Sequence, residues 1–387
     1  MSKPAAAKKP VVAEPEDITV ANTDVLTKYK TAADITSRII AQVAAASVDG
    51  ASILELCVNG DKAIEEAAQA VYKKDKKISK GIGFPTCISV NNVICHFSPL
   101  TSDGESPKLK NGDMVKIELG AQIDGYGSIA ATTIVVGASK ENPIKGKQAD
   151  VLMAAYQSAE AAVRLIRSGN VNNVVTDHVQ RIAAAYGCKP VEGMLSHQQE
   201  RNVIDGSKQI ILNPNENQRA DFSKCNFGEN EVYCVDIMIS SGDGKIKSSS
   251  SRTTIYKKTS GNYKLKMQTS RAVVSEISKK FGQFPFNLRK MDDEKKARMG
   301  LIEATKHRVV DAYEVQEEKD GEYVAQFLFT VCVMPNGPVR ITSTPIDLEL
   351  IQTEKKIEDE EINKLLASEI RPKKKKASKE GEEKKDA

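Results

Sequence analysis

The stretch from Met114 to Val136 constrains the fold most, because it contains two runs of alternating apolar residues around a tight turn at Asp124-Gly125. This period is typical of strands, and an Asp-Gly pair between two such runs predicts a β-hairpin. Glu118 lies among the apolar residues of the first run. An isolated carboxylate there is more often a hydrogen-bonded core residue than a metal ligand, so its role depends on its partners elsewhere in the chain.

Composition predicts a water-soluble globular protein, since 28% of the 387 residues are charged and 40% are hydrophobic. No apolar run approaches the roughly 20 residues that span a bilayer, and the first residues contain no apolar signal-peptide core. We therefore expect a protein that is neither secreted nor embedded in a membrane. The seven cysteines form no CxxC pair. This odd number favours a reducing compartment over a disulfide framework or a zinc site.

The order of predicted elements repeats along the chain. After a lead at residues 1–22 that is expected to be disordered, two helices at 23–48 and 52–72 precede strands that include the hairpin. Two further helices at 147–167 and 171–186 precede strands near 209–212, 231–240 and 252–256. Two such units of about 110 residues predict an internally duplicated α+β fold, in which helix-helix-strand units surround a curved antiparallel sheet.

The last third of the chain contains a basic segment and a charged tail. Helical patterns at 264–313 predict a basic helical insertion at about 257–315, within one domain that covers residues 23–352. Strands at 323–334 and 339–343 follow, joined by a Pro-Asn-Gly-Pro turn. Residues 353–387 are expected to form a short helix at 357–366 and a disordered lysine-rich tail.

Several long segments carry a family resemblance. GFPTCISVNNVICHFSP at 83–99 resembles the AFPT…NN…HYTP segment of type-two methionine aminopeptidases. MLSHQ…VIDG, EVYCVDIMISSGDGK, DEKKARMG and AQFLFTVCVMPNGPVRITS are similar to signatures of the proliferation-associated and curved-DNA-binding proteins, a non-peptidase branch of that superfamily. The resemblance implies the pita-bread fold over residues 20–351, with a helical insertion in the second half.

The resemblance also implies which residues stand at the metal site. Peptidases of this fold hold two metal ions with two Asp, one His and two Glu, and a further His lies on the substrate side. The corresponding residues of this chain, which we call the aligned positions, are Glu118 and Ile129 for the Asp pair, His197 for the ligand His, Asp236 and Leu328 for the Glu pair, and His96 for the substrate-side His.

Ile129 and Leu328 replace the two ligands that bridge the ions. Bridging oxygens keep two ions close together and orient the shared hydroxide, so their loss predicts a protein with no metal cofactor and no peptidase activity. Two alternatives stay open: a single weakly held metal on Glu118, His197 and Asp236, or an aminopeptidase that tolerates altered ligands.

Charge distribution suggests what such a protein binds. Residues 257–308 contain 14 Lys/Arg against 5 Asp/Glu, and residues 371–387 contain 8 against 4, whereas the whole chain has a net charge of only +4. Clustered positive charge favours a polyanionic partner, although solvated helix faces give the same pattern. The expected nucleic-acid contacts are Lys257, Lys258, Lys264, Lys266, Arg271, Lys279, Lys280, Arg289, Lys290, Lys295, Lys296, Arg298, Lys373, Lys374, Lys375 and Lys376.

The resemblance implies a regulator of growth, ribosome biogenesis or translation that binds ribosomes or structured RNA, with duplex DNA as another partner. It further implies a location in the nucleus, nucleolus and cytoplasm, and we expect a monomer. A protein-partner adaptor is the third alternative. Tyr263, Phe281, Phe284 and Phe286 lie within the basic block and either stack on bases or form a small local core.

Overall fold

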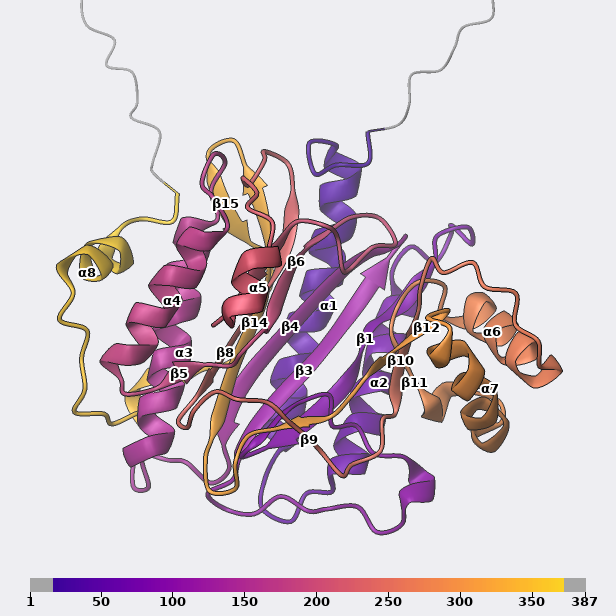
Figure 1. Ribbon diagram of the computed structural model, residues 1–387, viewed down its shortest axis with the longest axis horizontal. Coiled ribbons are helices and arrows are strands. Elements are labelled where there is room, and N and C mark those ends of the chain that lie inside the picture. The colour runs from indigo at the N-terminus through magenta and orange to yellow at the C-terminus, as the bar shows by residue number, and fades with distance from the viewer. Residues whose placement is uncertain (1–16, 372–387) are drawn as a thin grey trace, which may run out of the picture.

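A long antiparallel sheet organises the protein in a computed structural model that describes residues 17–371 (Figure 1). The expected hairpin is present as β3 (Met114–Ile123) and β4 (Tyr126–Val135). The sheet has the strand order β1-β3-β4-β14-β8-β6-β7, with β15 beside β14 and β5 beside β8. The other strands are β1 (Lys80–Val90), β5 (Lys189–Pro190), β6 (Leu195–Gln199), β7 (Gln209–Ile211), β8 (Val232–Ser240), β14 (Val324–Met334) and β15 (Gly337–Arg340).

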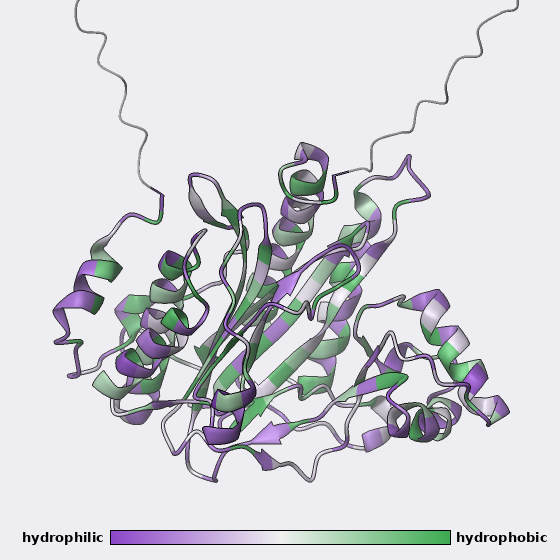
Figure 2. Ribbon diagram, turned by 45° about the horizontal axis from the view of Figure 1, so that its top comes forward, coloured by the Kyte–Doolittle hydropathy of each residue, from purple (hydrophilic) through white to green (hydrophobic). Residues whose placement is uncertain are grey.

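Two pairs of helices cover one face of this sheet. Helices α1 (Thr23–Ala46) and α2 (Ile53–Ala70) pack on the first hairpin, and α3 (Gly146–Leu165) and α4 (Asn173–Ala185) pack on β8 and β14. Ser52 caps α2 by accepting the Glu55 N–H, as its spacing predicts. Figure 2 shows much apolar colour on the central strands and both polar and apolar residues along the helices. The duplicated helix-helix-strand architecture is confirmed.

The period of two in β3 divides its side chains between the two faces of the sheet. Val115, Ile117 and Leu119 belong to the core beneath α1 and α2. The residues between them, Lys116 and Glu118, therefore point to the opposite face, where both are buried. A polar site on that face follows directly from the strand's alternation.

The inserted segment covers this second face and is not purely helical. Its helices α6 (Gln268–Lys280) and α7 (Glu294–Lys306) pack on a small sheet of β10 (Ile255–Lys258), β11 (Phe286–Asn287) and β12 (Val310–Tyr313). The expectation of helices throughout 264–313 is wrong at β11 and β12, because both strands pair with β10. Phe284 and Phe286 are buried, so the local-core alternative holds for these aromatics.

The remaining elements are short. A third sheet contains β2 (Val93–Cys95), β9 (Lys247–Ser248) and β13 (Gln316–Glu317), and α5 is Glu216–Asp221. Helix α8 (Glu360–Ala367) overlaps the helix expected at 357–366 but begins three residues later and ends one residue later, and its Ile362 is buried in the core around α3. None of the helices in residues 17–371 has the length and apolar character that a membrane span requires.

The expected disordered lead ends earlier than residue 22. Val20 is 1% exposed and belongs to a cluster with Tyr29 and Tyr126, and the side chain of Asn22 accepts the Asp24 N–H to cap α1. Residues 17–22 are thus part of the fold. Residues 1–16 and 372–387 lie outside the described residues.

A buried ion pair joins the insertion to α2. Arg289, whose side chain is 7% exposed, donates to Asp61 at 2.9 Å, and Asp61 is 1% exposed. The guanidinium also donates to the Ser98 hydroxyl and the Pro99 carbonyl, and Asp61 accepts the Thr86 N–H. This network satisfies both buried charges. Removal of either charged side chain would leave the other as an unpaired buried charge.

Arg289→Met leaves Asp61 buried without its cation, and we expect it to lower the free energy of unfolding by about 3–5 kcal/mol. Lys290→Met is the matched control, because its Glu65 partner is half exposed and such pairs contribute up to about 1 kcal/mol. Denaturant unfolding of the two variants measures the difference. Equal stability of both variants would contradict a structural role for the Arg289–Asp61 pair.

Candidate functional site

Strand register places the predicted carboxylates in one row across four strands. Glu118 on β3 pairs with Ala131 on β4, Ala131 pairs with Leu328 on β14, and Leu328 pairs with Asp236 on β8. Residues directly opposite in an antiparallel pair point to the same face of the sheet. Glu118, Leu328 and Asp236 therefore face the side away from the helices.

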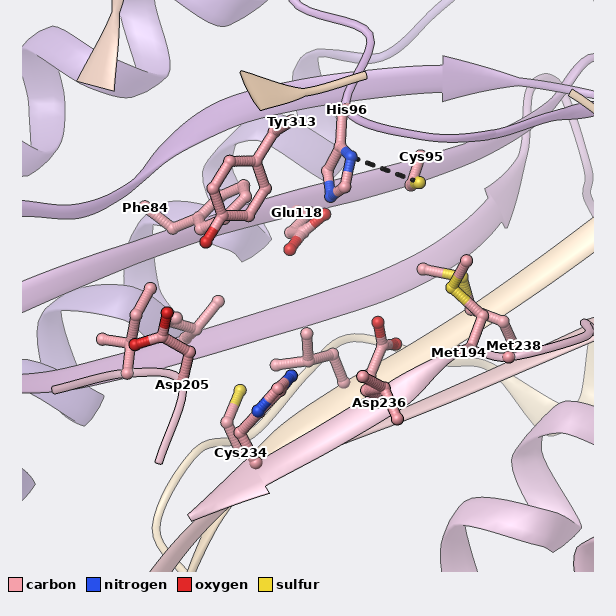
Figure 3. A pocket seen from close by; sticks show the side chains of 16 residues that line it. Phe84, Cys95, His96, Glu118, Met194, Asp205, Cys234, Asp236, Met238 and Tyr313 are labelled. Carbon is pink, nitrogen blue, oxygen red and sulfur yellow. Dashed lines mark hydrogen bonds between the residues drawn. The ribbon is translucent and has the colours of Figure 1, made fainter. Parts of the chain in front are cut away.

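The same register brings two further aligned positions to this face. Ile129 lies two residues before Ala131, and His197 on β6 pairs with Cys234, which lies two residues before Asp236. A cavity of about 240 Å³ collects all six aligned positions in its lining, together with apolar and sulfur-containing side chains (Figure 3). The lining consists of Phe84, Cys95, His96, Glu118, Ile129, Gly193, Met194, Leu195, His197, Ile204, Asp205, Cys234, Asp236, Met238, Tyr313 and Leu328.

Two of the three carboxyl groups that line the cavity, those of Glu118 and Asp236, have few hydrogen-bond donors; Glu118 is buried and Asp236 is partly buried. Gln326 donates from Nε2 to both carboxylate oxygens of Asp236, at 3.0 and 3.2 Å. Glu118 Oε2 has no hydrogen-bond partner among the described residues. Burial raises the pKa of Glu118, and the nearby charge of Asp236 raises it further; burial likewise raises the pKa of Asp236. The site therefore favours protonated carboxyl groups at pH values where surface carboxyls are ionised.

Both histidines of the cavity are held neutral. Burial lowers the pKa of His96 to about 4, and its Nδ1 lies 3.1 Å from the Glu314 carbonyl, which accepts a hydrogen bond from it. Burial also lowers the pKa of His197, whose Nδ1 lies 3.4 Å from Gln209 Nε2. His96 has a φ of 65° and packs against Phe84 and Tyr313.

The donor set does not fit a dinuclear metal centre. Ile129 and Leu328, which the resemblance aligns with the two bridging ligands, belong to an apolar cluster with Phe84, Ile204 and Cys234 and supply no oxygen. Over residues 17–371, no three His, Cys, Asp or Glu side chains are grouped so as to hold a metal ion. The arrangement offers a mostly apolar cavity lined by the buried carboxyl group of Glu118, the partly buried one of Asp236 and the more exposed one of Asp205.

Two predicted nucleic-acid contacts are buried instead. Lys257, with a side chain 8% exposed, donates to Asp205 at the cavity at 2.7 Å, and Arg289 forms the network with Asp61. Neither cation is free to contact phosphate without breaking its ion pair. Charge counting missed this because it does not distinguish an ion-paired cation from a free one. Asp205 was also missed, since nothing in VIDG indicates a partner 52 residues away.

The other predicted basic residues divide by exposure. Lys258, Lys290 and Arg298 are half-buried. Lys290 pairs with Glu65 and Arg298 with Glu294. Exposed residues of the insertion are Lys264, Lys266, Arg271, Lys279, Lys280, Lys295 and Lys296. Lys373, Lys374, Lys375 and Lys376 lie outside the described residues.

Comparison with known proteins agrees with this geometry. The sequence profile of metallopeptidase family M24 matches residues 27–257. The Curved DNA-binding protein of Schizosaccharomyces pombe is 47% identical over 92% of this chain and 93% of its own length. This chain belongs to family M24, in its curved-DNA-binding and proliferation-associated branch.

Two other relatives support the assignment. Proliferation-associated protein A of Dictyostelium discoideum is 40% identical, covering 93% of this chain and 92% of its own. The solved structure of a thermophilic Arx1 superposes with a TM-score of 0.84 at 37% identity, covering 91% of this chain and 100% of the other. The fold is thus the pita-bread fold of M24 peptidases, as the resemblance implies.

The raised pKa values predict how stability depends on pH. Above about pH 5, ordinary carboxyl groups of the unfolded chain lose their protons, whereas Glu118 and Asp236 keep theirs in the folded state. Unfolding therefore becomes more favourable as the pH rises towards neutrality. Glu118→Gln should flatten this decline in denaturant titrations, whereas the control Glu65→Gln, at a half-exposed position, should not. An unchanged decline in Glu118→Gln would contradict the burial argument.

Restoring both carboxylates tests the alignment. Ile129→Asp combined with Leu328→Glu places acids in an apolar cluster, so we expect a loss of about 1–3 kcal/mol per residue in chelator. Added Mn²⁺ should raise the melting temperature of this variant, because a ligand of the folded state stabilises it. The amide control, Ile129→Asn with Leu328→Gln, should not respond in this way. A carboxylate variant as stable as the parent in chelator would mean that these positions do not face the cavity.

Proposed function

We propose that this protein is a catalytically inactive member of family M24 that binds nucleic acid through its insertion. Its main partner is structured RNA, including ribosomal RNA, and duplex DNA is a second class of partner. The aliphatic residues at both bridging positions argue against metal-dependent peptide hydrolysis. The name of the Schizosaccharomyces pombe relative, Curved DNA-binding protein, supports a nucleic-acid partner.

The proposal depends on the acidic residues between positions 257 and 308 of the insertion, all five of which are already engaged. Glu276 and Asp292 pair with Lys280, Asp293 caps α7, Glu294 pairs with Arg298, and Glu303 accepts two backbone N–H groups. In the described part of the chain, no carboxylate lies within ion-pair distance of the exposed lysines at 264, 266, 279, 295, 296 and 306. Unpaired cations at this density favour contact with a phosphate backbone.

The biological setting belongs to the same proposal. We propose a monomer that moves between nucleus, nucleolus and cytoplasm, associates with ribosomes and regulates growth or translation. The name Proliferation-associated protein A, carried by the Dictyostelium discoideum relative, is consistent with a growth-linked role. The rival functions are an aminopeptidase and a protein-partner adaptor. If either is correct, neutralising the exposed lysines should not selectively reduce binding to nucleic acid.

Neutralising the insertion tests this proposal. The variant replaces five exposed lysines by Gln at Lys264, Lys266, Lys279, Lys295 and Lys296, and the matched control replaces five exposed lysines elsewhere at Lys30, Lys108, Lys145, Lys189 and Lys224. Each phosphate contact contributes about −0.7 to −0.9 to the slope of log affinity against log salt, so loss of five contacts in the insertion variant should flatten the slope by about 3.5–4.5. Anisotropy titrations with an RNA hairpin and a DNA duplex, and ribosome co-sedimentation, measure the effect. Parent-like affinity and slope in the insertion variant would refute the proposed surface.

A further inference from the structure

Helix α7 presents an unusual line of side chains to solvent. Its core side consists of Ala297, Gly300, Leu301 and Ala304. On the opposite side, residues spaced by four, three and four positions align along the helix axis, which we call the α7 stripe: Lys295, Met299, Ile302 and Lys306.

The centre of the α7 stripe is apolar and uncovered. Met299 is 52% exposed and Ile302 is 70% exposed, although the neighbouring Leu301 is fully packed against α6. Met267 is 45% exposed, and its N–H donates to the carboxylate of Glu303, the residue that follows Ile302 in α7. Adjacent exposed apolar residues on an outward helix face are typical of a contact surface.

The charge around the apolar pair indicates the kind of partner. Lys295 and Lys306 are exposed at the two ends of the stripe, and eleven residues at 1.5 Å each separate them by about 16 Å. Glu303 is the acidic residue beside Ile302 in α7. Its carboxylate accepts hydrogen bonds from the N–H groups of Lys266 and Met267, at 2.6 and 3.0 Å. The stripe therefore presents positive charge on both sides of an apolar centre.

A nucleic-acid strand with an unstacked base has the complementary pattern. The faces of an exposed nucleobase are apolar, and phosphates lie on either side of it along the backbone. A fully paired helix, by contrast, buries these faces in its stack. Apolar side chains that contact bases in this way occur where a strand is kinked or a base is unpaired.

We propose that the α7 stripe binds an unpaired nucleobase, with Met299 and Ile302 against the base and Lys295 and Lys306 on the flanking phosphates. The inference rests on the proposed nucleic-acid function and adds a preference for bulged or unpaired positions. It assigns affinity to the lysines and discrimination between paired and unpaired sites to the apolar pair.

The test compares two double variants on two RNA hairpins, one fully paired and one with a single-nucleotide bulge. Met299→Ser with Ile302→Ser should weaken binding to the bulged hairpin about 5- to 100-fold, the range for loss of one base contact, with an unchanged salt slope. It should leave the paired hairpin unaffected. Lys295→Gln with Lys306→Gln should weaken both hairpins and flatten the slope by about 1.5. Because all four positions are exposed, melting temperatures should match the parent.

The outcomes separate this inference from the proposed function. If the apolar variant binds the bulged hairpin as the parent does while the lysine variant loses affinity, the base contact is wrong and the nucleic-acid function stands. If the five-lysine variant described above also binds normally, the proposed function fails.

A bulged DNA duplex shows whether the sugar contributes to recognition. An equal loss of affinity for bulged DNA and bulged RNA supports recognition of the base alone, whereas a loss of affinity for RNA only supports a base contact aided by the 2′-hydroxyl. Parent-like binding of the apolar variant to both the bulged RNA hairpin and the bulged DNA duplex overturns the inference and favours a protein partner for the stripe.

Discussion

The two-residue period of β3 is the constraint on which the rest of this structure depends. With Val115, Ile117 and Leu119 committed to the core beneath α1 and α2, Glu118 has to face the other side of the sheet. The pairing of β3, β4, β14 and β8 then aligns Glu118 with Ala131, Leu328 and Asp236 in one row across the sheet. A shift of one residue in any of these strands would move its member of the row into the helical layer.

The content of that row determines what the cavity is able to do. Carboxylates spaced across one sheet face suit a metal pair only where the intervening residues also supply oxygens. Here Leu328 lies between the two acids and Ile129 lies close by, and both add to the apolar cluster that holds the insertion against the sheet. Burial raises the pKa of Glu118 and of Asp236, so the cavity favours neutral carboxyl groups.

Much of the fold was accessible from the sequence, because its signals are local. The Asp124-Gly125 hairpin and the Ser52 cap depend on residues a few positions apart. The six aligned positions also meet in one cavity, as the resemblance to the aminopeptidases implies. What the sequence could not provide was long-range pairing: Arg289 with Asp61 and Lys257 with Asp205 are separated by 228 and 52 residues. For the same reason the charge count overestimated the free basic surface, and the exposed Met299 and Ile302 were not distinguished from core residues.

The central claim is that replacement of both bridging ligands has converted a peptidase fold into a binding protein. Metal analysis of the purified protein, combined with an assay of methionine release from a methionyl peptide in the presence of Mn²⁺ or Co²⁺, tests it most directly. The account predicts substoichiometric metal and no release above that of a chelated control. Stoichiometric metal together with chelator-sensitive release of methionine would contradict it.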